Sequence, residues 1–164
     1  MKHAFKQILV PTDFSVGSRL AVDYAMELAG RLGASVHLLH VVEDPPVAGL
    51  FTEAHADLES LKRKRRSDAR HLMNALLGAL KRHDITNEIA GGPVAATIAG
   101  VAADRGADFI VMGTHGRTGL SHVLVGSVAE QVLRIAGCPV LTVREGLAER
   151  EDFAAALSRE SKGT

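Results

Sequence analysis

The strongest constraint on the fold of this chain is the alternation of short apolar segments with stretches of helical periodicity. The apolar segments are rich in Val, Ile and Leu and are bounded by Gly, Pro or polar residues, which is typical of buried strands. Between them, apolar residues recur every three or four positions, which predicts helices with one buried face. The predicted strands are residues 5–10, 36–42, 85–90, 108–112 and 139–143. The predicted helices contain residues 20–32, about 53–83, 96–102 and 120–135.

Strands that are apolar throughout and alternate with helices predict a parallel sheet that is covered on both faces. Because crossovers between parallel strands are right-handed, an α/β doubly wound open sheet is the leading topology. Asp13 or Ser15 is expected to cap the first helix, and Gly33 to end it in a left-handed conformation. The longest helix is expected to bury one face, formed by Leu58, Leu61, Ala69, Leu72, Met73, Leu76 and Leu80.

Length and composition narrow the class of protein further. The chain has 164 residues, which favours one domain. Hydrophobic residues make up 46% of the chain, and its 19 Lys and Arg balance 19 Asp and Glu. The high apolar content and the zero net charge exclude a disordered chain. The zero net charge also makes nucleic acid an unexpected partner. Cys138 is the only cysteine, so neither an intrachain disulfide nor a cysteine-rich zinc site is expected. No apolar run suits a signal peptide or a membrane span, so we expect a cytoplasmic chain without a membrane partner.

The loops after the strands are the candidate binding segments, because ligands of open parallel sheets bind beyond the carboxyl ends of the strands. Three such loops are residues 11–15, 41–44 and 113–119. The last contains Gly113, Gly116 and Gly119, which allow the backbone to approach a ligand and to direct N–H groups at it. His115 and Arg117 add donors or positive charge, and the following helix would present the positive end of its dipole. Each glycine alone could serve only a tight turn or close packing, but together they favour an anion site.

Gly126 and Ser127 fall inside the predicted helix 120–135, where a glycine costs about 1 kcal/mol relative to alanine. Two explanations fit: close approach by a phosphate, or a new helix start capped by Ser127. The sequence has no P-loop, no G-x-G-x-x-G after the first strand and no G-x-S-x-G nucleophile elbow. These other nucleotide-binding and nucleophile loops are therefore excluded.

The glycine spacing matches a family signature. Gly113-x2-Gly116-x9-Gly126-Ser127 has the spacing G-x2-G-x9-G-[ST] of universal stress proteins of the ATP-binding type. Residues 8–15, 38–42, 108–116 and 138–143 match the family's opening strand and loop, its second strand and its last two strands. The chain therefore resembles the universal stress protein family over about residues 3–144. We expect a universal stress protein domain at 1–144 and a polar tail at 145–164, with a short helical pattern at 153–157.

The resemblance implies a Rossmann-like fold of the adenine nucleotide alpha hydrolase type, with five strands in the order 3-2-1-4-5 and four flanking helices. It implies bound ATP, with Mg²⁺ able to arrive through the phosphate oxygens. At the nucleoside end it implies Pro11, Thr12, Asp13, Val41 and Met112. Around the ribose and phosphates it implies Gly113, His115, Gly116, Arg117, Gly126, Ser127 and Val128. It also implies a homodimer through the last strand, at Val140, Leu141 and Val143, which would cover an exposed sheet edge.

The function predicted from this resemblance is that of a regulatory, nucleotide-dependent dimer in the stress response. No general base or P-loop lysine is recognisable, so efficient ATP hydrolysis is not expected and no residue is assigned as catalytic. A slow ATPase stays an alternative, with His115 as its one candidate base, although His115 could also be a solvated loop residue. A nucleotide-independent interaction module is another; it would use the basic run 62–66, which is otherwise interpreted as a solvated helix face. Asp13 could be only a turn former, and no metal site made by the protein alone is expected.

Overall fold

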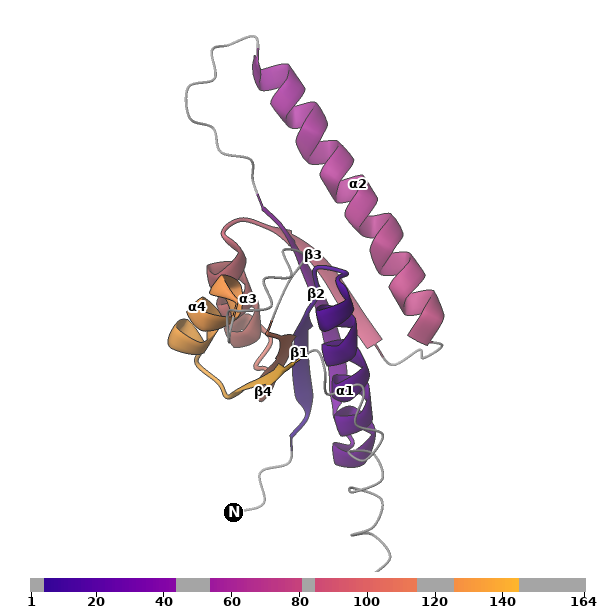
Figure 1. Ribbon diagram of the computed structural model, residues 1–164, viewed down its shortest axis with the longest axis vertical. Coiled ribbons are helices and arrows are strands. Elements are labelled where there is room, and N and C mark those ends of the chain that lie inside the picture. The colour runs from indigo at the N-terminus through magenta and orange to yellow at the C-terminus, as the bar shows by residue number, and fades with distance from the viewer. Residues whose placement is uncertain (1–4, 44–53, 81–84, 115–125, 145–164) are drawn as a thin grey trace, which may run out of the picture.

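Five parallel strands form one sheet in the order β3-β2-β1-β4-β5. The structure is a computed structural model that describes residues 5–43, 54–80, 85–114 and 126–144 (Figure 1). The strands are β1 (Gln7–Pro11), β2 (Ser35–Val42), β3 (Ile85–Gly91), β4 (Phe109–Gly113) and β5 (Val140–Val143). This order confirms the doubly wound open sheet. The chain adds strands to one side of β1 and then to the other, so the switch point of the topology lies between β1 and β4. The predicted tail and its short helix lie outside the described residues.

Two helices cover each face of the sheet (Figure 1). They are α1 (Val16–Leu32), α2 (Ala54–Leu80), α3 (Val94–Asp104) and α4 (Ser127–Ile135). Ile8 and Val10 of β1 pack with α1 and with Met73 of α2, whereas Leu9 packs on the opposite face with Ile98 of α3. Successive side chains of a strand point to opposite faces, so one apolar strand supplies both cores. None of the helices in the described ranges is long and apolar enough to cross a membrane.

The ends of α1 follow the sequence prediction. Ser15 is the N-cap, and its hydroxyl accepts a hydrogen bond from the backbone N–H of Ser18 at 3.2 Å. A cap of this kind stabilises a helix by about 1 kcal/mol. Gly33 ends the helix with a φ of 68°, a left-handed conformation that glycine adopts without steric cost. Of the two candidate caps, Asp13 instead accepts from the backbone N–H of Ser15 at 3.0 Å and forms the preceding turn.

The helix predicted at 120–135 begins at Ser127 in the structure, so its predicted length was wrong. Gly126 is the N-cap, and its φ of −68° and ψ of 154° lie outside the helical region. Residues 120–125 lie outside the described residues. The explanation of Gly126 as a helix start is therefore confirmed, although the cap is Gly126 itself and not Ser127. Apolar residues keep helical spacing in the sequence on both sides of Gly126, so this spacing alone could not locate the start of the helix.

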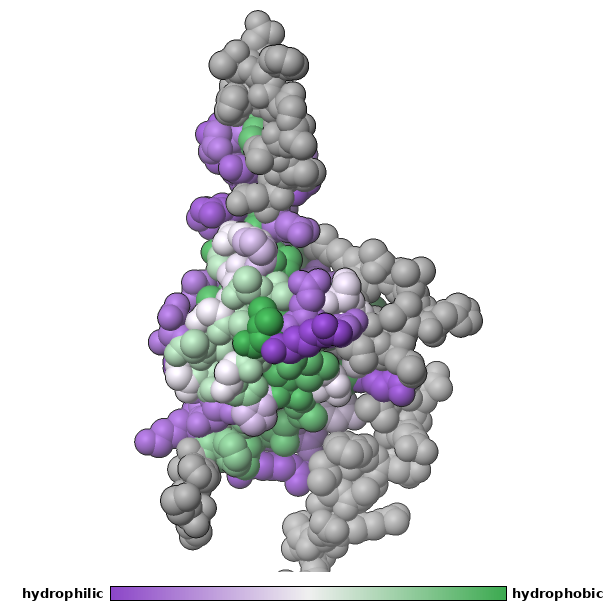
Figure 2. Space-filling view, turned by 90° about the vertical axis from the view of Figure 1, so that its left-hand side faces the viewer, coloured by the Kyte–Doolittle hydropathy of each residue, from purple (hydrophilic) through white to green (hydrophobic). Residues whose placement is uncertain are grey.

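The long helix α2 is only partly packed on the sheet. Met73 is 1% exposed and Leu76 is buried, whereas Leu61 and Leu72, predicted on the same buried face, are 40% and 43% exposed. The amino-terminal half of α2 projects beyond the sheet (Figure 1), and Figure 2 shows hydrophilic residues on that projection. The prediction for Leu61 was wrong because helical periodicity does not show where a helix leaves the body of the domain. The prediction for Leu72 was wrong because periodicity does not show how far the buried face extends around the helix: Ala69 and Met73 beside it are buried.

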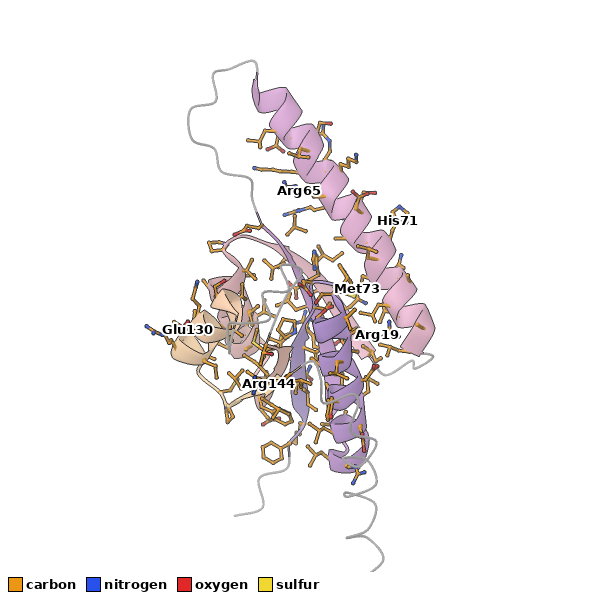
Figure 3. All side chains as sticks on the ribbon, viewed as in Figure 1. Arg19, Arg65, His71, Met73, Glu130 and Arg144 are labelled. Carbon is orange, nitrogen blue, oxygen red and sulfur yellow. The ribbon has the colours of Figure 1, made fainter. Side chains whose placement is uncertain are left out.

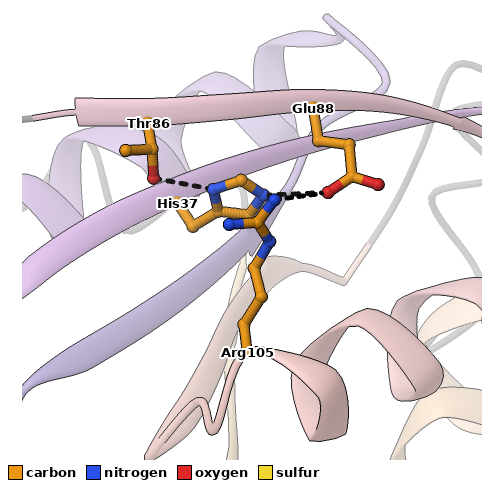
Figure 4. Close-up of polar contacts among 4 residues, drawn as sticks. All are labelled: His37, Thr86, Glu88 and Arg105. Atoms are coloured by element: carbon orange, nitrogen blue, oxygen red, sulfur yellow. Dashed lines mark hydrogen bonds and ion pairs between the residues drawn. The ribbon is translucent and has the colours of Figure 1, made fainter.

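A polar cluster around the buried His37 joins β3, at the edge of the sheet, to β2 (Figure 4). Nδ1 of the fully buried His37 lies 2.7 Å from Oγ1 of Thr86. Arg105, at the end of α3, donates to Oε2 of Glu88 at 2.7 Å, and the same oxygen lies 3.6 Å from His37 Nε2. Burial, followed by the charge of Arg105, lowers the pKa of His37 below its ordinary value, and the hydrogen bond from Arg105 lowers the pKa of Glu88. His37 therefore remains a neutral member of this cluster at neutral pH.

Candidate functional site

A cavity of about 870 Å³ opens at the carboxyl ends of β1, β2 and β4, next to the reversal of strand order. Ligands of doubly wound sheets bind at this position. The lining includes all nine predicted site residues that the structure describes: Pro11, Thr12, Asp13, Val41, Met112, Gly113, Gly126, Ser127 and Val128. His115, Gly116 and Arg117 lie outside the described residues. The structure brings the nine together around one space, while their contact with a ligand stays a prediction.

The loop between β1 and α1 is fixed by Thr12. Its backbone N–H donates to the carbonyl of Leu39 at 2.8 Å, which ties the loop to β2. Its hydroxyl accepts from the backbone N–H of Phe14 at 3.1 Å and lies 3.1 Å from the hydroxyl of Ser18. Thr12 is only 5% exposed, so its side chain holds the loop in shape at the wall of the cavity.

Asp13 stands at the mouth of the cavity and is held there by Ser15. Both the backbone N–H and the hydroxyl of Ser15 donate to Asp13 Oδ1, at 3.0 and 2.5 Å. Asp13 therefore does form the turn. A carboxylate has about four lone-pair sites, so a turn role is compatible with accepting hydrogen bonds from a ligand hydroxyl as well.

His40 also lines the cavity, although it is not among the predicted site residues. Its Nδ1 lies 2.7 Å from the carbonyl oxygen of Thr12, so that nitrogen carries the proton and donates. Its ring lies 4.5 Å from the ring of Phe14, which has a φ of 64°. A bulky side chain is rarely found at a positive φ, and such strain is concentrated at binding loops. His40 thus holds the strained part of the loop that carries Asp13.

Gly113 is required by packing at the end of β4. A Cβ placed there would come within 2.9 Å of the backbone C and O atoms of Gly17, at the start of α1. No real side chain tolerates that distance to backbone atoms, so the close packing that the sequence left open for this glycine is confirmed. Gly113 also lines the cavity.

The start of α4 is tied back to the end of β4. The backbone N–H of Gly126 donates to the carbonyl of Thr114 at 2.6 Å, and the N–H of Thr114 donates to the carbonyl of Val143 at 2.9 Å. Gly126 has no side chain with which to cap the first-turn N–H groups of α4, and Ser127 is exposed beside them. A helix start of this kind favours an anion. We call Gly113, Thr114, Gly126 and Ser127 the α4 end of the cavity.

One further wall of the cavity comes from α2, which sequence reasoning missed. Figure 3 shows Arg65 on the side of α2 that faces β2, with His71 on the opposite side. Nη1 of Arg65 donates to the carbonyl of Glu43 at 3.3 Å. We call the four cavity-lining residues of this helix the α2 wall; they are Arg65, Asp68, Ala69 and Leu72. Their spacing was visible in the sequence, but nothing there fixed the angle at which α2 crosses the sheet.

The charges on the described lining do not by themselves select an anion. Asp13, Glu43 and Asp68 carry carboxylates, and Arg65 carries a guanidinium. Any phosphate bound by this part of the chain would depend on backbone N–H groups, hydroxyls and the dipole of α4. Among the described residues, no group of three His, Cys, Asp or Glu side chains is placed to hold a metal ion.

The fold and the position of the cavity define the class: a doubly wound α/β protein with a cavity at its switch point. The model of the Universal stress protein family matches residues 4–144. The chain therefore belongs to the universal stress protein family, as the glycine spacing predicted.

Relatives of known sequence or structure agree with this assignment. Universal stress protein MJ0531 of Methanocaldococcus jannaschii is 37% identical over 147 residues, which cover 88% of this chain and 85% of that protein. The solved structure of MJ0577, from the same organism, has a TM-score of 0.77 and 30% identity, and the match covers 87% of this chain and 98% of that one. A universal stress protein solved in complex with cAMP has a TM-score of 0.60 and 25% identity, with 86% and 98% covered.

Proposed function

We propose that this chain binds ATP in the cavity at the switch point and that nucleotide occupancy regulates a stress-response dimer. The observation that carries the proposal is the convergence of nine predicted nucleotide-site residues on one cavity, from three separate strand ends and the start of α4. A related universal stress protein has been solved with cAMP, an adenine nucleotide, which supports a nucleotide of this class.

Each part of the cavity has a role in this proposal. The start of α4 would bind phosphates through the N–H groups of Ser127 and Val128 and the hydroxyl of Ser127. Asp13 would accept hydrogen bonds from the ribose, and the backbone of Val41 would pair with the edge of adenine. Mg²⁺ would be held by the phosphates and water, since the described residues form no metal site of their own.

Ser127→Ala tests the proposal with little disturbance to the fold, because Ser127 is exposed. A hydrogen bond to a charged group contributes about 1.5–3 kcal/mol, so we expect ATP affinity to fall about tenfold or more by isothermal titration calorimetry. Ser67→Ala, also exposed but absent from the cavity lining, is the control and should bind as the unaltered protein does. Failure of the unaltered protein to bind ATP, and to carry an adenine nucleotide through purification, would refute the proposal.

The proposed dimer would form along β5, which lies at the edge of the sheet. Leu141 on this strand is 43% exposed, and Leu133 and Ile135 of α4 are 47% and 53% exposed. Figure 2 shows hydrophobic residues gathered on the face formed by α3 and α4. Val143 is 4% exposed, so it would contribute backbone rather than side chain to a partner. Exposed apolar residues beside an open edge favour association with a second copy.

Leu141→Lys is expected to convert the dimer to a monomer in multi-angle light scattering, because it places a charge at the centre of the proposed interface. Leu32→Lys is the matched control: Leu32 is 42% exposed, at the end of α1, and this change should leave the mass unchanged. A monomeric unaltered protein would refute the dimer. The domain boundary at residue 144 and the cytoplasmic location stay predictions from the sequence.

A further inference from the structure

We propose that the α2 wall receives the base of the bound nucleotide, so that Arg65 and Leu72 determine affinity for the nucleoside part of the ligand. The inference rests on the proposed function, which assigns a nucleotide to the cavity. It adds a recognition surface from outside the glycine signature and the strand-end loops, on a helix whose basic run was interpreted as a solvated face.

The four residues of the α2 wall form one helical stripe. They follow the spacing i, i+3, i+4 and i+7, which places side chains one above another on the same side of a helix. Ala69 is buried at the base of the stripe, while Arg65, Asp68 and Leu72 are exposed within the cavity. A whole face of α2 therefore borders the site.

Arg65 is anchored beside the strand end at which adenine is proposed to pair. Its guanidinium donates to the carbonyl of Glu43, two residues after Val41. Figure 3 shows it on the side of α2 that faces β2. A planar guanidinium held in this way can stack on the face of an aromatic ring, which combines dispersion with cation–π attraction. The base of a nucleotide is such a ring.

Leu72 gives an independent reason to place a flat apolar group here. Its side chain is 43% exposed although it lies on a helix packed against the domain, and it lines the cavity. The next residue, Met73, is 1% exposed and already serves the core. The exposed apolar surface of Leu72 is thus available to a ligand ring.

The charges separate the two ends of the cavity. Arg65 and Asp68 carry opposite charges, so the lining of the α2 wall has no net charge. The α4 end offers uncapped N–H groups and the positive end of a helix dipole. A nucleotide with its phosphates at the α4 end therefore extends its base toward α2.

The test compares ATP with adenosine, both measured by competition against a fluorescent ATP analogue so that weak binding is detected. Arg65→Gln should weaken ATP and adenosine by the same factor, about 3- to 30-fold, because both carry the base. Leu72→Ser should do the same. Arg63→Gln is the control: Arg63 is exposed about 200° around the helix from Arg65 and does not line the cavity, so binding should not change. Ser127→Ala should weaken ATP and leave adenosine nearly unaffected.

The outcomes distinguish the two proposals. Binding that Arg65→Gln and Leu72→Ser leave unchanged, in a protein that Ser127→Ala weakens for ATP, would overturn the α2 assignment and retain the proposed function. A loss in Arg65→Gln that is larger for ATP than for adenosine would also overturn it, because Arg65 would then contact phosphate. An unaltered protein that binds neither ligand would overturn the proposed function and this inference together.

Discussion

The two ends of the cavity are built in different ways. The α4 end consists mainly of backbone: Gly113, which is packed against the start of α1, and a helix start tied to β4 through the N–H of Gly126 and the carbonyl of Thr114. The α2 wall consists of side chains on a helix that meets the site only because of the angle at which it crosses the sheet. The first kind of surface leaves a signature in the sequence, because Gly113 has no room for a Cβ. The second leaves none, because many side chains can occupy a helix surface.

The largest effect is expected within α2, where adjacent residues serve the core and the cavity. Met73→Ala removes a side chain that is 1% exposed and should lower the free energy of unfolding by about 2–5 kcal/mol. Leu72→Ala removes one that is 43% exposed and should cost under about 1 kcal/mol. Urea denaturation without nucleotide measures both changes. Equal losses would show that Leu72 supports the fold, and the distinction between core and wall would then fail.

Gly113→Ala should come next, and it tests whether the α4 end is rigid backbone. The new Cβ would meet backbone atoms of Gly17 at 2.9 Å, so we expect a loss of about 1–3 kcal/mol in the free energy of unfolding. Gly100→Ala, within α3, meets nothing within 4 Å and should stabilise the protein by up to about 1 kcal/mol. Thermal denaturation compares the two. A Gly113→Ala protein as stable as its parent would contradict the packing argument. Because the fold itself is affected, Ser127→Ala remains the better probe of phosphate binding.

The smallest effect concerns pH and the edge strand β3. β3 is held to β2 by the His37, Glu88 and Arg105 cluster, and the backbone N–H of Gly92 donates to the carbonyl of Val42 near the cavity. The pKa of His37 is lowered by burial and by Arg105, so the unfolded chain binds more protons below pH 6.5. Stability should therefore fall as the pH is lowered through and below 6.5, by at most about 1.4 kcal/mol per pH unit for this one proton.

The pKa of Glu88, lowered by Arg105, adds a second loss as the pH falls through about 4.5, because the unfolded carboxylate takes up its proton first. Urea denaturation between pH 5 and 7.5 measures the first slope. His37→Gln should flatten that slope, whereas His71→Gln, on the exposed side of α2, should leave it unchanged. A parent slope that persists in His37→Gln would show that another group controls the loss.

Much of the fold followed from local pattern. Strand and helix periodicities located every described element, and Ser15 and Gly33 marked the ends of α1 because capping depends on neighbouring residues only. The predictions were wrong where helical spacing does not indicate the start of a helix or the burial of a side chain. Helical spacing ran through Gly126, where the structure has a cap, and Leu61 and Leu72 shared the spacing of the core residues without sharing their burial.

The candidate site divides along the same line. The sequence by itself determined the α/β order of elements and the glycine spacing that indicates the family, because periodicity and a missing Cβ are properties of the chain. Only the tertiary structure decided that Asp13, Gly113 and Ser127 line one cavity, and that Arg65 and Leu72 line it as well. Side-chain neighbours across a domain depend on how helices cross the sheet, and that angle is set by packing over the whole molecule.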